Sequence, residues 1–172
     1  MSYNIRPVET SDAEFILGLR TNPKLNRFLS STSGSREDQV KWIEQYKVKE
    51  KKGEEFYYLV EEDGVKRGLF RLYNINSVSF TVGSWLFTSC ENKNLPILSY
   101  LLMCDIGFYD VNLPVLLFDV RKKNRKVLQF TSLKNPLFYT EDKLNKFFLV
   151  LKENWEKSKK NVLDFYLLMR KL

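Results

Sequence analysis

The chain contains no histidine among its 172 residues. This absence excludes Ser-His-Asp and Cys-His nucleophile systems and any zinc site built on imidazole ligands. The two cysteines, Cys90 and Cys104, do not have a metal-ligand spacing, and without a secretion signal we expect both thiols to be reduced. Any proton transfer must therefore use a carboxylate, Tyr, Lys, Cys, a chain terminus or water.

Long hydrophobic runs are also missing. No apolar stretch approaches the roughly 20 residues that span a bilayer, and the first residues, Met1–Arg6, contain no signal-peptide core. We therefore expect a cytoplasmic protein without membrane insertion. Hydrophobic residues make up 44% of the chain and aromatic residues 15%, which is enough apolar surface for one folded domain over residues 1–172.

Basic residues outnumber acidic ones by 28 to 21, and the net charge is +7. A basic surface can attract nucleic acid, anionic lipid or a polyphosphate ligand. The sequence has no nucleic-acid-binding motif, and its aromatic residues fall at strand and core spacing, so we expect no specific nucleic-acid partner. We interpret the basic clusters at 47–52 and 157–160 as solvated helix faces, whereas the cluster at 121–126 follows a predicted strand.

Hydrophobic periodicity and turn residues predict a mixed sheet with helices, an α/β (α+β) fold. The predicted order is β-α-α-β-β-β-α-β-α-β plus a C-terminal helix, and the crossover within 78–120 is expected to be right-handed. Asp63-Gly64 is a hairpin signal. Strands are predicted over 3–8, 55–61, 65–75, 78–88, 113–120 and 136–140, and helices over 12–20, 35–52, 95–109, 121–133 and 152–172.

Three further expectations concern one ambiguous segment, two tryptophans and the C-terminal segment. The segment Asn145–Lys152 fits either a strand or a helix. Trp42 and Trp155 are interpreted as packing residues on helices. The segment Lys152–Leu172 is more apolar than a free tail, so we expect it to close the domain or to form a homodimer contact.

This order of elements resembles the GNAT superfamily of acyl-coenzyme A N-acyltransferases. Phe80–Phe87 resembles the central fourth strand, Asn92–Leu102 the pyrophosphate loop with its helix, and Phe118–Phe130 the fifth strand with the fourth helix. The pattern F-D-V-R-K-x-N-x-K-V, which begins at Phe118, is similar to that of bacterial members that acylate nucleotide-linked amino sugars for surface polysaccharide biosynthesis. It is also similar to that of relatives that acetylate the N-termini of ribosomal proteins.

The resemblance implies a binding site for acetyl-CoA or another acyl-coenzyme A. The phosphates would lie on backbone N–H groups where a helix opens at Leu95. The pantetheine arm would pair with the edge of Trp85–Thr88, in a gap where the fifth strand diverges from the fourth. The implied cofactor-binding residues are Leu86, Phe87, Asn92, Lys93, Asn94, Leu95 and Asn124, and the implied substrate contacts are Tyr73, Trp85 and Arg121, with Lys122 and Arg125 nearby.

The chain departs from the family pattern at three places. The stretch from Asn92 to Ile97 has no glycine, although close approach of phosphate to backbone favours glycine, and its Pro96 lacks an N–H. The family's tyrosine, seven residues after Asn124, is Thr131 here, and its carboxylate, two residues before Gly83, is Thr81. The predicted catalytic residues are Ser84, Tyr139 and Thr131, and the replacement groups considered for the acid and the base also include Tyr73, Asp105, Ser132 and Glu141.

The leading hypothesis is an acyl-CoA-dependent N-acyltransferase that acts on the amine of an amino sugar, with a nucleotide attached to the sugar. One alternative is an acetyltransferase of protein N-terminal amines. Another is a degenerate domain that binds coenzyme A without turnover and serves as a sensor or a partner subunit. A substrate screen for thiol release would separate these hypotheses.

Overall fold

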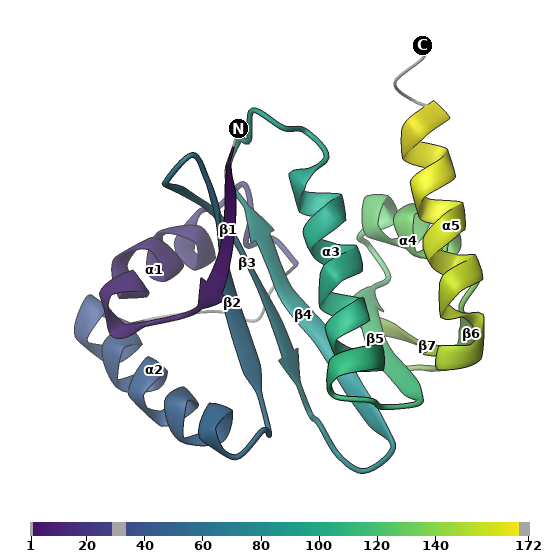
Figure 1. Cartoon of the computed structure of the whole chain (residues 1–172), viewed down its shortest axis with the longest axis horizontal. Coiled ribbons are helices and arrows are strands. Elements are labelled where there is room, and N and C mark those ends of the chain that lie inside the picture. The colour runs from purple at the N-terminus through teal and green to yellow at the C-terminus, as the bar shows by residue number, and fades with distance from the viewer. Residues whose placement is uncertain (1, 29–33, 169–172) are drawn as a thin grey trace.

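The computed structural model describes all residues except 1, 29–33 and 169–172. It is built on an open, mixed sheet of seven strands with helices on both faces (Figure 1). The strands are β1 (Tyr3–Pro7), β2 (Phe56–Glu62), β3 (Val65–Tyr73), β4 (Ser79–Phe87), β5 (Val115–Arg121), β6 (Leu137–Glu141) and β7 (Asn145–Leu151). The helices are α1 (Ala13–Thr21), α2 (Arg36–Lys51), α3 (Leu95–Asp105), α4 (Arg125–Ser132) and α5 (Lys152–Leu168), with short turns η1 (Thr10–Asp12) and η2 (Ile106–Asp110).

The mixed sheet and its helices confirm the predicted fold class, with one strand added. The ambiguous segment from Asn145 is strand β7, and it lies between β5 and β6 in the sheet order β1-β2-β3-β4-β5-β7-β6. The predicted order therefore lacked one strand. The predicted fourth helix also begins later than expected, because Arg121 still belongs to β5 and Asn124 caps α4 by accepting a hydrogen bond from the Val127 N–H.

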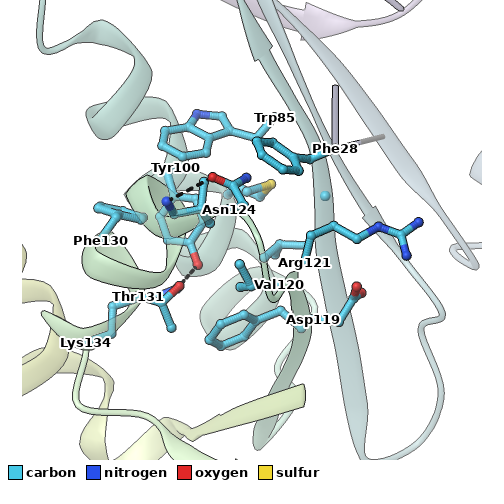
Figure 2. Close-up of a pocket in the computed structure, with 15 residues that line it drawn as sticks. Phe28, Trp85, Tyr100, Asp119, Val120, Arg121, Asn124, Phe130, Thr131 and Lys134 are labelled. Atoms are coloured by element: carbon cyan, nitrogen blue, oxygen red, sulfur yellow. Dashed lines mark hydrogen bonds between the residues drawn. The ribbon is translucent and has the colours of Figure 1, made fainter. Parts of the chain in front are cut away.

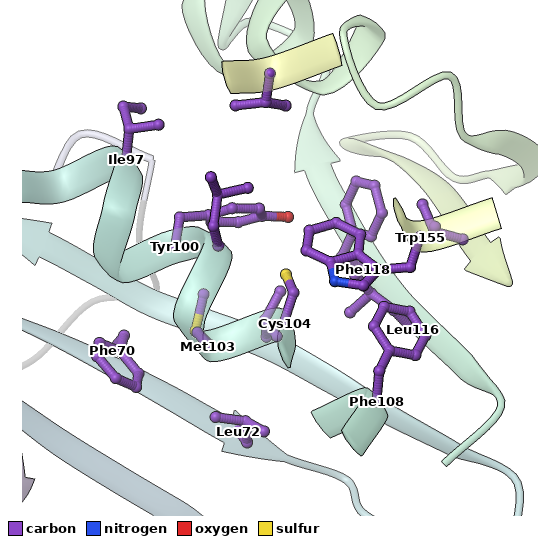
Figure 3. Packing of buried hydrophobic residues seen from close by; sticks show 14 of the residues in the cluster. Phe70, Leu72, Ile97, Tyr100, Met103, Cys104, Phe108, Leu116, Phe118 and Trp155 are labelled. Atoms are coloured by element: carbon purple, nitrogen blue, oxygen red, sulfur yellow. The ribbon is translucent and has the colours of Figure 1, made fainter. Parts of the chain in front are cut away.

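Two helical layers cover the sheet. The core on one face joins α1 and α2 to Leu59 and Leu69, and the core on the other face joins α3 and α5 to Phe70 and Leu116. Figure 3 shows part of the second core, where the fully buried Trp155 of α5 packs against Phe108 with ring centroids 5.4 Å apart. This confirms that α5 closes the domain. Residues 169–172 of the predicted helix lie outside the described residues.

Other sequence expectations concern smaller features. Trp42 stacks on Tyr46, with centroids 5.9 Å apart, which confirms its packing role on α2. Cys90 and Cys104 are both buried and free. The turn Asp63-Gly64 has positive φ values of 50° and 75°, as a tight hairpin between β2 and β3 requires. Within the described ranges, no helix combines the length and the apolar character needed to cross a membrane.

A β-bulge interrupts β4 at Ser84. Leu69 pairs with Leu86 while Arg71 pairs with Gly83, so that two residues of β4 lie opposite one residue of β3. Ser84 adopts the left-handed conformation, with φ 48°. The extra residue reverses the alternation of side chains: Phe80 and Val82 belong to the core under α3, whereas Leu86 belongs to the core under α1 and α2.

The parallel pairing of β4 with β5 is short. It runs only from Ser79↔Val115 to Thr81↔Leu117. Beyond that point β4 remains paired with β3 and β5 remains paired with β7, so the two strands separate while each stays within the sheet. The predicted gap between diverging strands is therefore confirmed, and it begins directly before the bulge.

Candidate active site

A cavity of about 180 Å³ lies where β4 and β5 separate. Strands β4 and β5 form its two sides, α3 and α4 contribute most of the remaining wall, and Phe28 lies at one edge (Figure 2). The residues that line it are Phe28, Val82, Gly83, Trp85, Tyr100, Met103, Phe118, Asp119, Val120, Arg121, Asn124, Val127, Phe130, Thr131 and Lys134. Aromatic and aliphatic side chains thus make up most of the cavity wall, and a smaller number of polar groups accompany them, as is common in ligand sites.

The polar groups of the cavity lie on two sides of the sheet. Leu116, Phe118 and Val120 face the core under α3. Because side chains alternate along a strand, Asp119 and Arg121 project from the opposite face. Figure 2 shows Asp119 and Arg121 on one side of the cavity, with Thr131 and Lys134 across from them.

Asp119 is the one carboxylate among the described residues that line the cavity. Desolvation by the surrounding protein atoms raises the pKa of Asp119 above its ordinary value, and the neighbouring guanidinium of Arg121 opposes that rise. A carboxylate of raised pKa beside a cavity is a candidate general base. Arg121 can hold an anionic group next to it, because its planar fork of donors matches a phosphate or a carboxylate.

The unpaired edge of β4 is the part of the site that an acyl-coenzyme A arm would occupy. The edge of β4 from Val82 to Phe87 has no partner from β5, so its backbone groups can pair with the amides of an extended chain. Trp85 lies beside this edge. Its ring centroid is 5.1 Å from that of Tyr100 and 5.4 Å from that of Phe130, and its Nε1 donates to the Pro96 carbonyl at 2.9 Å. The open edge and the cavity beside it therefore fit the arm.

Asn124 lies in the cavity wall and also caps α4. Its Oδ1 accepts the Val127 N–H at 3.3 Å, which leaves the Nδ2 group as a donor toward a ligand. We expect Asn124→Ala to cost about 1 kcal/mol of stability through the lost cap and to raise KM for acetyl-CoA severalfold. Asn124→Ser keeps a capping oxygen but loses the amide donor, so it should raise KM with little change in melting temperature. Equal KM values for Asn124→Ser and wild type, measured by thiol release, would contradict the binding role.

The loop before α3 differs from the expected phosphate cradle. The buried carboxylate of Glu62 accepts the N–H groups of Glu91 and Asn92, both at 2.9 Å, and these bonds hold the pKa of Glu62 below its usual value. The Asn92 side-chain oxygen accepts the Asn94 N–H at 3.0 Å, and Lys93 Nζ donates to the Cys90 carbonyl at 2.9 Å. Side chains therefore fix the shape of this glycine-free loop, and several donors expected to meet phosphate are engaged within the protein.

Two loop predictions are met only in position. Asn94 occupies the N-cap position of α3, but its side chain does not cap the helix. Leu95 opens the helix as predicted and is buried, 4% exposed, in the core. Neither side chain lies in the wall of the cavity between the strands.

The predicted catalytic residues do not come together. Thr131 lines the cavity, 2% exposed, and its Oγ1 has no hydrogen-bond partner among the described residues. Ser84 forms the bulge, and Tyr139 is 67% exposed on the edge strand β6; neither is part of the cavity lining. Their catalytic roles stay predictions that the cavity does not support.

Other predicted groups have structural contacts. Tyr73 lies against the backbone of β4, where a Cβ atom on Gly83 would come within 2.9 Å of its ring. Phe87 occupies the space above Gly68, and Leu86 is in the core. Asp105 accepts from Trp155 Nε1 and from Lys159 Nζ, each at 2.6 Å, so its carboxylate is engaged by α5. Lys122 and Glu141 form an ion pair at 2.8 Å, and the Ser132 hydroxyl donates to the Gln129 carbonyl at 2.7 Å.

Sequence reasoning missed three polar groups of the cavity: Tyr100, Asp119 and Lys134. Asp119 lies inside the F-D-V-R stretch, and strand alternation with Phe118 and Val120 in the core could have placed it on the opposite face. Tyr100 reads as one more apolar position of α3. No pattern in the sequence distinguishes Lys134 from the other lysines of this basic chain.

Comparison with known proteins gives a consistent result. The sequence model of the GNAT acetyltransferase domain matches residues 3–131. The solved structure of apo FdhC, described as a nucleotide-linked sugar GNAT, superposes with a TM-score of 0.82 at 34% identity, covering 92% of this chain and 91% of that chain. No curated protein sequence matches.

Two more distant structures share the fold. A ribosomal-protein alanine acetyltransferase from Vibrio fischeri gives a TM-score of 0.76 at 18% identity, over 90% of this chain and 96% of that chain. A spermidine N-acetyltransferase from Vibrio cholerae, solved with CoA and spermine, gives 0.74 at 18% identity, over 90% and 98%. At this identity the likeness shows the fold alone.

Proposed function

This chain belongs to the GNAT acetyltransferase family, and from that membership we propose that it transfers an acyl group from acyl-coenzyme A to the amine of a nucleotide-linked amino sugar. The family and its neighbours make the chain an acyl-CoA-dependent N-acyltransferase that uses acetyl-CoA. The acceptor class is the proposed part. It rests on the arrangement of Asp119 and Arg121 beside the gap and on the likeness to the nucleotide-linked sugar GNAT at 34% identity.

The described residues can divide the work of the reaction. When bound, acetyl-CoA supplies a thioester carbonyl carbon that an amine can attack. The open β4 edge and Asn124 would hold the extended arm, and Trp85 would keep water from it. Holding two reactants in attacking geometry can lower a barrier by several kcal/mol, on the order of 7–11 in favourable cases.

The acceptor side of the site has the charges that the proposed substrate requires. Arg121 would bind a phosphate of the nucleotide, and Asp119 would take the proton that the attacking nitrogen must lose. In the described part of the chain no ion pair involves Arg121, whereas Lys122 is held by Glu141. On the side of the cavity that holds Asp119, Arg121 is therefore a cation available to meet a substrate anion.

A thiol-release assay with acetyl-CoA tests the acceptor class. The panel should contain nucleotide-linked amino sugars, the same amino sugars without the nucleotide, an N-terminal peptide and a polyamine. We expect turnover with a nucleotide-linked amino sugar and a KM at least tenfold higher for the free sugar. Arg121→Met should raise KM for the nucleotide-linked substrate while leaving KM for acetyl-CoA unchanged.

Two other outcomes would favour the alternatives. Turnover with the peptide and not with the sugars would indicate an N-terminal amine acetyltransferase. Tight binding of coenzyme A without thiol release in any mixture would indicate a non-catalytic binder. The engagement of the loop N–H groups by Glu62 is the observation that keeps this second alternative open.

A further inference from the structure

Lys134 is a buried cation that the reaction outlined above does not yet use. Lys134 comes shortly after the end of α4 in the chain, and the residue is 1% exposed. Its Nζ donates a hydrogen bond to the Tyr100 hydroxyl and lies 3.9 Å from the centroid of the Phe118 ring and 5.3 Å from that of Phe130. No carboxylate forms an ion pair with it in the part of the chain that the structure describes. Burial of a charge without a counter-charge is costly, so its retention here calls for an explanation.

The groups around Lys134 converge on the floor of the cavity. Lys134, Tyr100 and Thr131 all line it, on the side opposite Asp119 and Arg121 (Figure 2). The Thr131 hydroxyl is buried and lacks a partner among the described residues. A buried hydroxyl without a partner and an ammonium group without a counter-charge, both beside one cavity, indicate a ligand that brings a polar or negatively charged atom to this floor.

The reaction creates such an atom. When an amine attacks a thioester, the bond between carbon and sulfur breaks and the electron pair stays on sulfur as a thiolate, which must take up a proton. In the proposed arrangement the acyl donor lies along the β4 edge and the acceptor lies beside Asp119. The group that gives a proton to the sulfur must then lie on the other side of the gap, where Tyr100 and Lys134 are found.

We propose that Tyr100 and Lys134 form the proton-donating pair for the departing sulfur. The O–H bond of Tyr100 breaks as its proton passes to sulfur, and an N–H bond of Lys134 breaks as its proton passes to the Tyr100 oxygen. Asp119 accepts the proton that the acceptor nitrogen loses, and exchange with water returns both groups to their starting states. Protons therefore balance over one turnover. This inference rests on the proposed transfer to an amine.

The electrostatics of the pair agree with this role. Burial lowers the pKa of Lys134 to about 8, and burial raises the pKa of Tyr100 well above its ordinary value. A thiol titrates ordinarily at about 8.5, so proton transfer from Lys134 to a thiolate is close to balanced or downhill. The other titratable neighbour on α3 is Cys104, whose thiol pKa burial raises to about 12, and Asp105 beyond it is engaged by Trp155 and Lys159.

The pH dependence of turnover tests the pair. We expect kcat of the wild type to fall at alkaline pH as Lys134 loses its proton, with an apparent pKa near 8. Lys134→Met and Tyr100→Phe should lower kcat by about 100-fold, and Lys134→Met should remove that alkaline limb. KM for acetyl-CoA should change little. Lys126→Met is the matched control, because Lys126 is an exposed lysine on α4, the helix that precedes Lys134, and it should behave as wild type.

A change of leaving group separates proton donation from a structural role. An acetyl thioester of an electron-poor thiophenol expels a thiolate that needs no proton. With this donor, Lys134→Met should come within about threefold of wild type, whereas a distorted site would stay slow. An alkaline limb that persists in Lys134→Met, or an undiminished defect with the activated donor, would overturn the proposal.

The outcomes distinguish this inference from the proposed function. Equal thiol release by wild type and Lys134→Met would overturn the pair and leave the transferase intact. Absence of thiol release from wild type with every acceptor would overturn the proposed function. In that case, calorimetry of coenzyme A binding in two buffers of different ionisation enthalpy measures the protons exchanged on binding. A proton exchange that is present in wild type and lost in Lys134→Met supports contact between the pair and the sulfur. Identical proton exchange in the two proteins overturns the proposed pair.

Discussion

Asp119→Asn is expected to lower kcat by about 100- to 1,000-fold, the range typical of a lost general base. The amide keeps the size of the side chain but cannot accept the proton from the attacking nitrogen. Desolvation raises the pKa of Asp119, and the base works only when ionised. Turnover by wild type should therefore fall on acidification at a pH above the ordinary range of an aspartate, and this acidic limb should be absent from Asp119→Asn. Initial rates across the pH range measure both effects.

Glu141→Gln is the matched control for this experiment. Glu141 is an exposed carboxylate on β6 that forms an ion pair with Lys122, and it does not line the cavity. Removing its charge should leave kcat and the acidic limb unchanged. If Asp119→Asn retains kcat within threefold of wild type, the assignment of the base is wrong and water must carry the proton.

Of the substitutions proposed here, Trp155→Ala should lower the free energy of unfolding most, by about 3–5 kcal/mol, because it opens a cavity in a packed core. Trp155 is fully buried, packs on Phe108, and donates from Nε1 to Asp105 at 2.6 Å. It therefore joins α5 to α3 and to the turn that follows it. For a domain of this size the melting temperature should fall by roughly 10 °C. Chemical denaturation followed by far-UV circular dichroism gives the free energy of unfolding.

Two variants calibrate this result. Trp155→Phe keeps most of the ring and loses only the hydrogen bond to Asp105, so it should cost about 1–2 kcal/mol. Trp42→Ala removes a half-buried tryptophan that stacks on Tyr46 at the other face of the sheet, and it should cost less than half as much as Trp155→Ala. A loss under 1 kcal/mol for Trp155→Ala would show that α5 contributes little to folding.

The sequence predicted the elements whose patterns are local. The strands of the β2–β3–β4 meander are joined by recognisable turns, and Asp63-Gly64 adopts the conformation that its residues favour. Strand β7 was ambiguous because its apolar run, Phe147–Leu151, fits a buried strand or a helix equally. Its pairing with β5 on one side and β6 on the other decides the outcome, and such pairing is not local.

The site was predictable only in part, for a similar reason. The gap and the place of Asn124 in its wall were implied by the resemblance of short local patterns to the GNAT family, and the structure has both. The Tyr100–Lys134 pair joins α3 to the segment that follows α4, and the Glu62 bonds to the loop join β2 to a segment about thirty positions later. The local sequence does not predict these contacts, because they join residues that are distant in the chain. The shifted pKa values of these side chains arise from burial and from these distant partners.

The break in the β4–β5 ladder makes one opening that reaches both faces of the sheet. In the proposed arrangement the amine lies beside Asp119 and Arg121 while the acyl donor lies along β4, so neither has to leave before the other binds. Cysteine and serine are absent from the described residues that line the cavity. The acyl group would therefore pass directly from donor to acceptor within a single ternary complex, without being stored on a cysteine or a serine between two half-reactions.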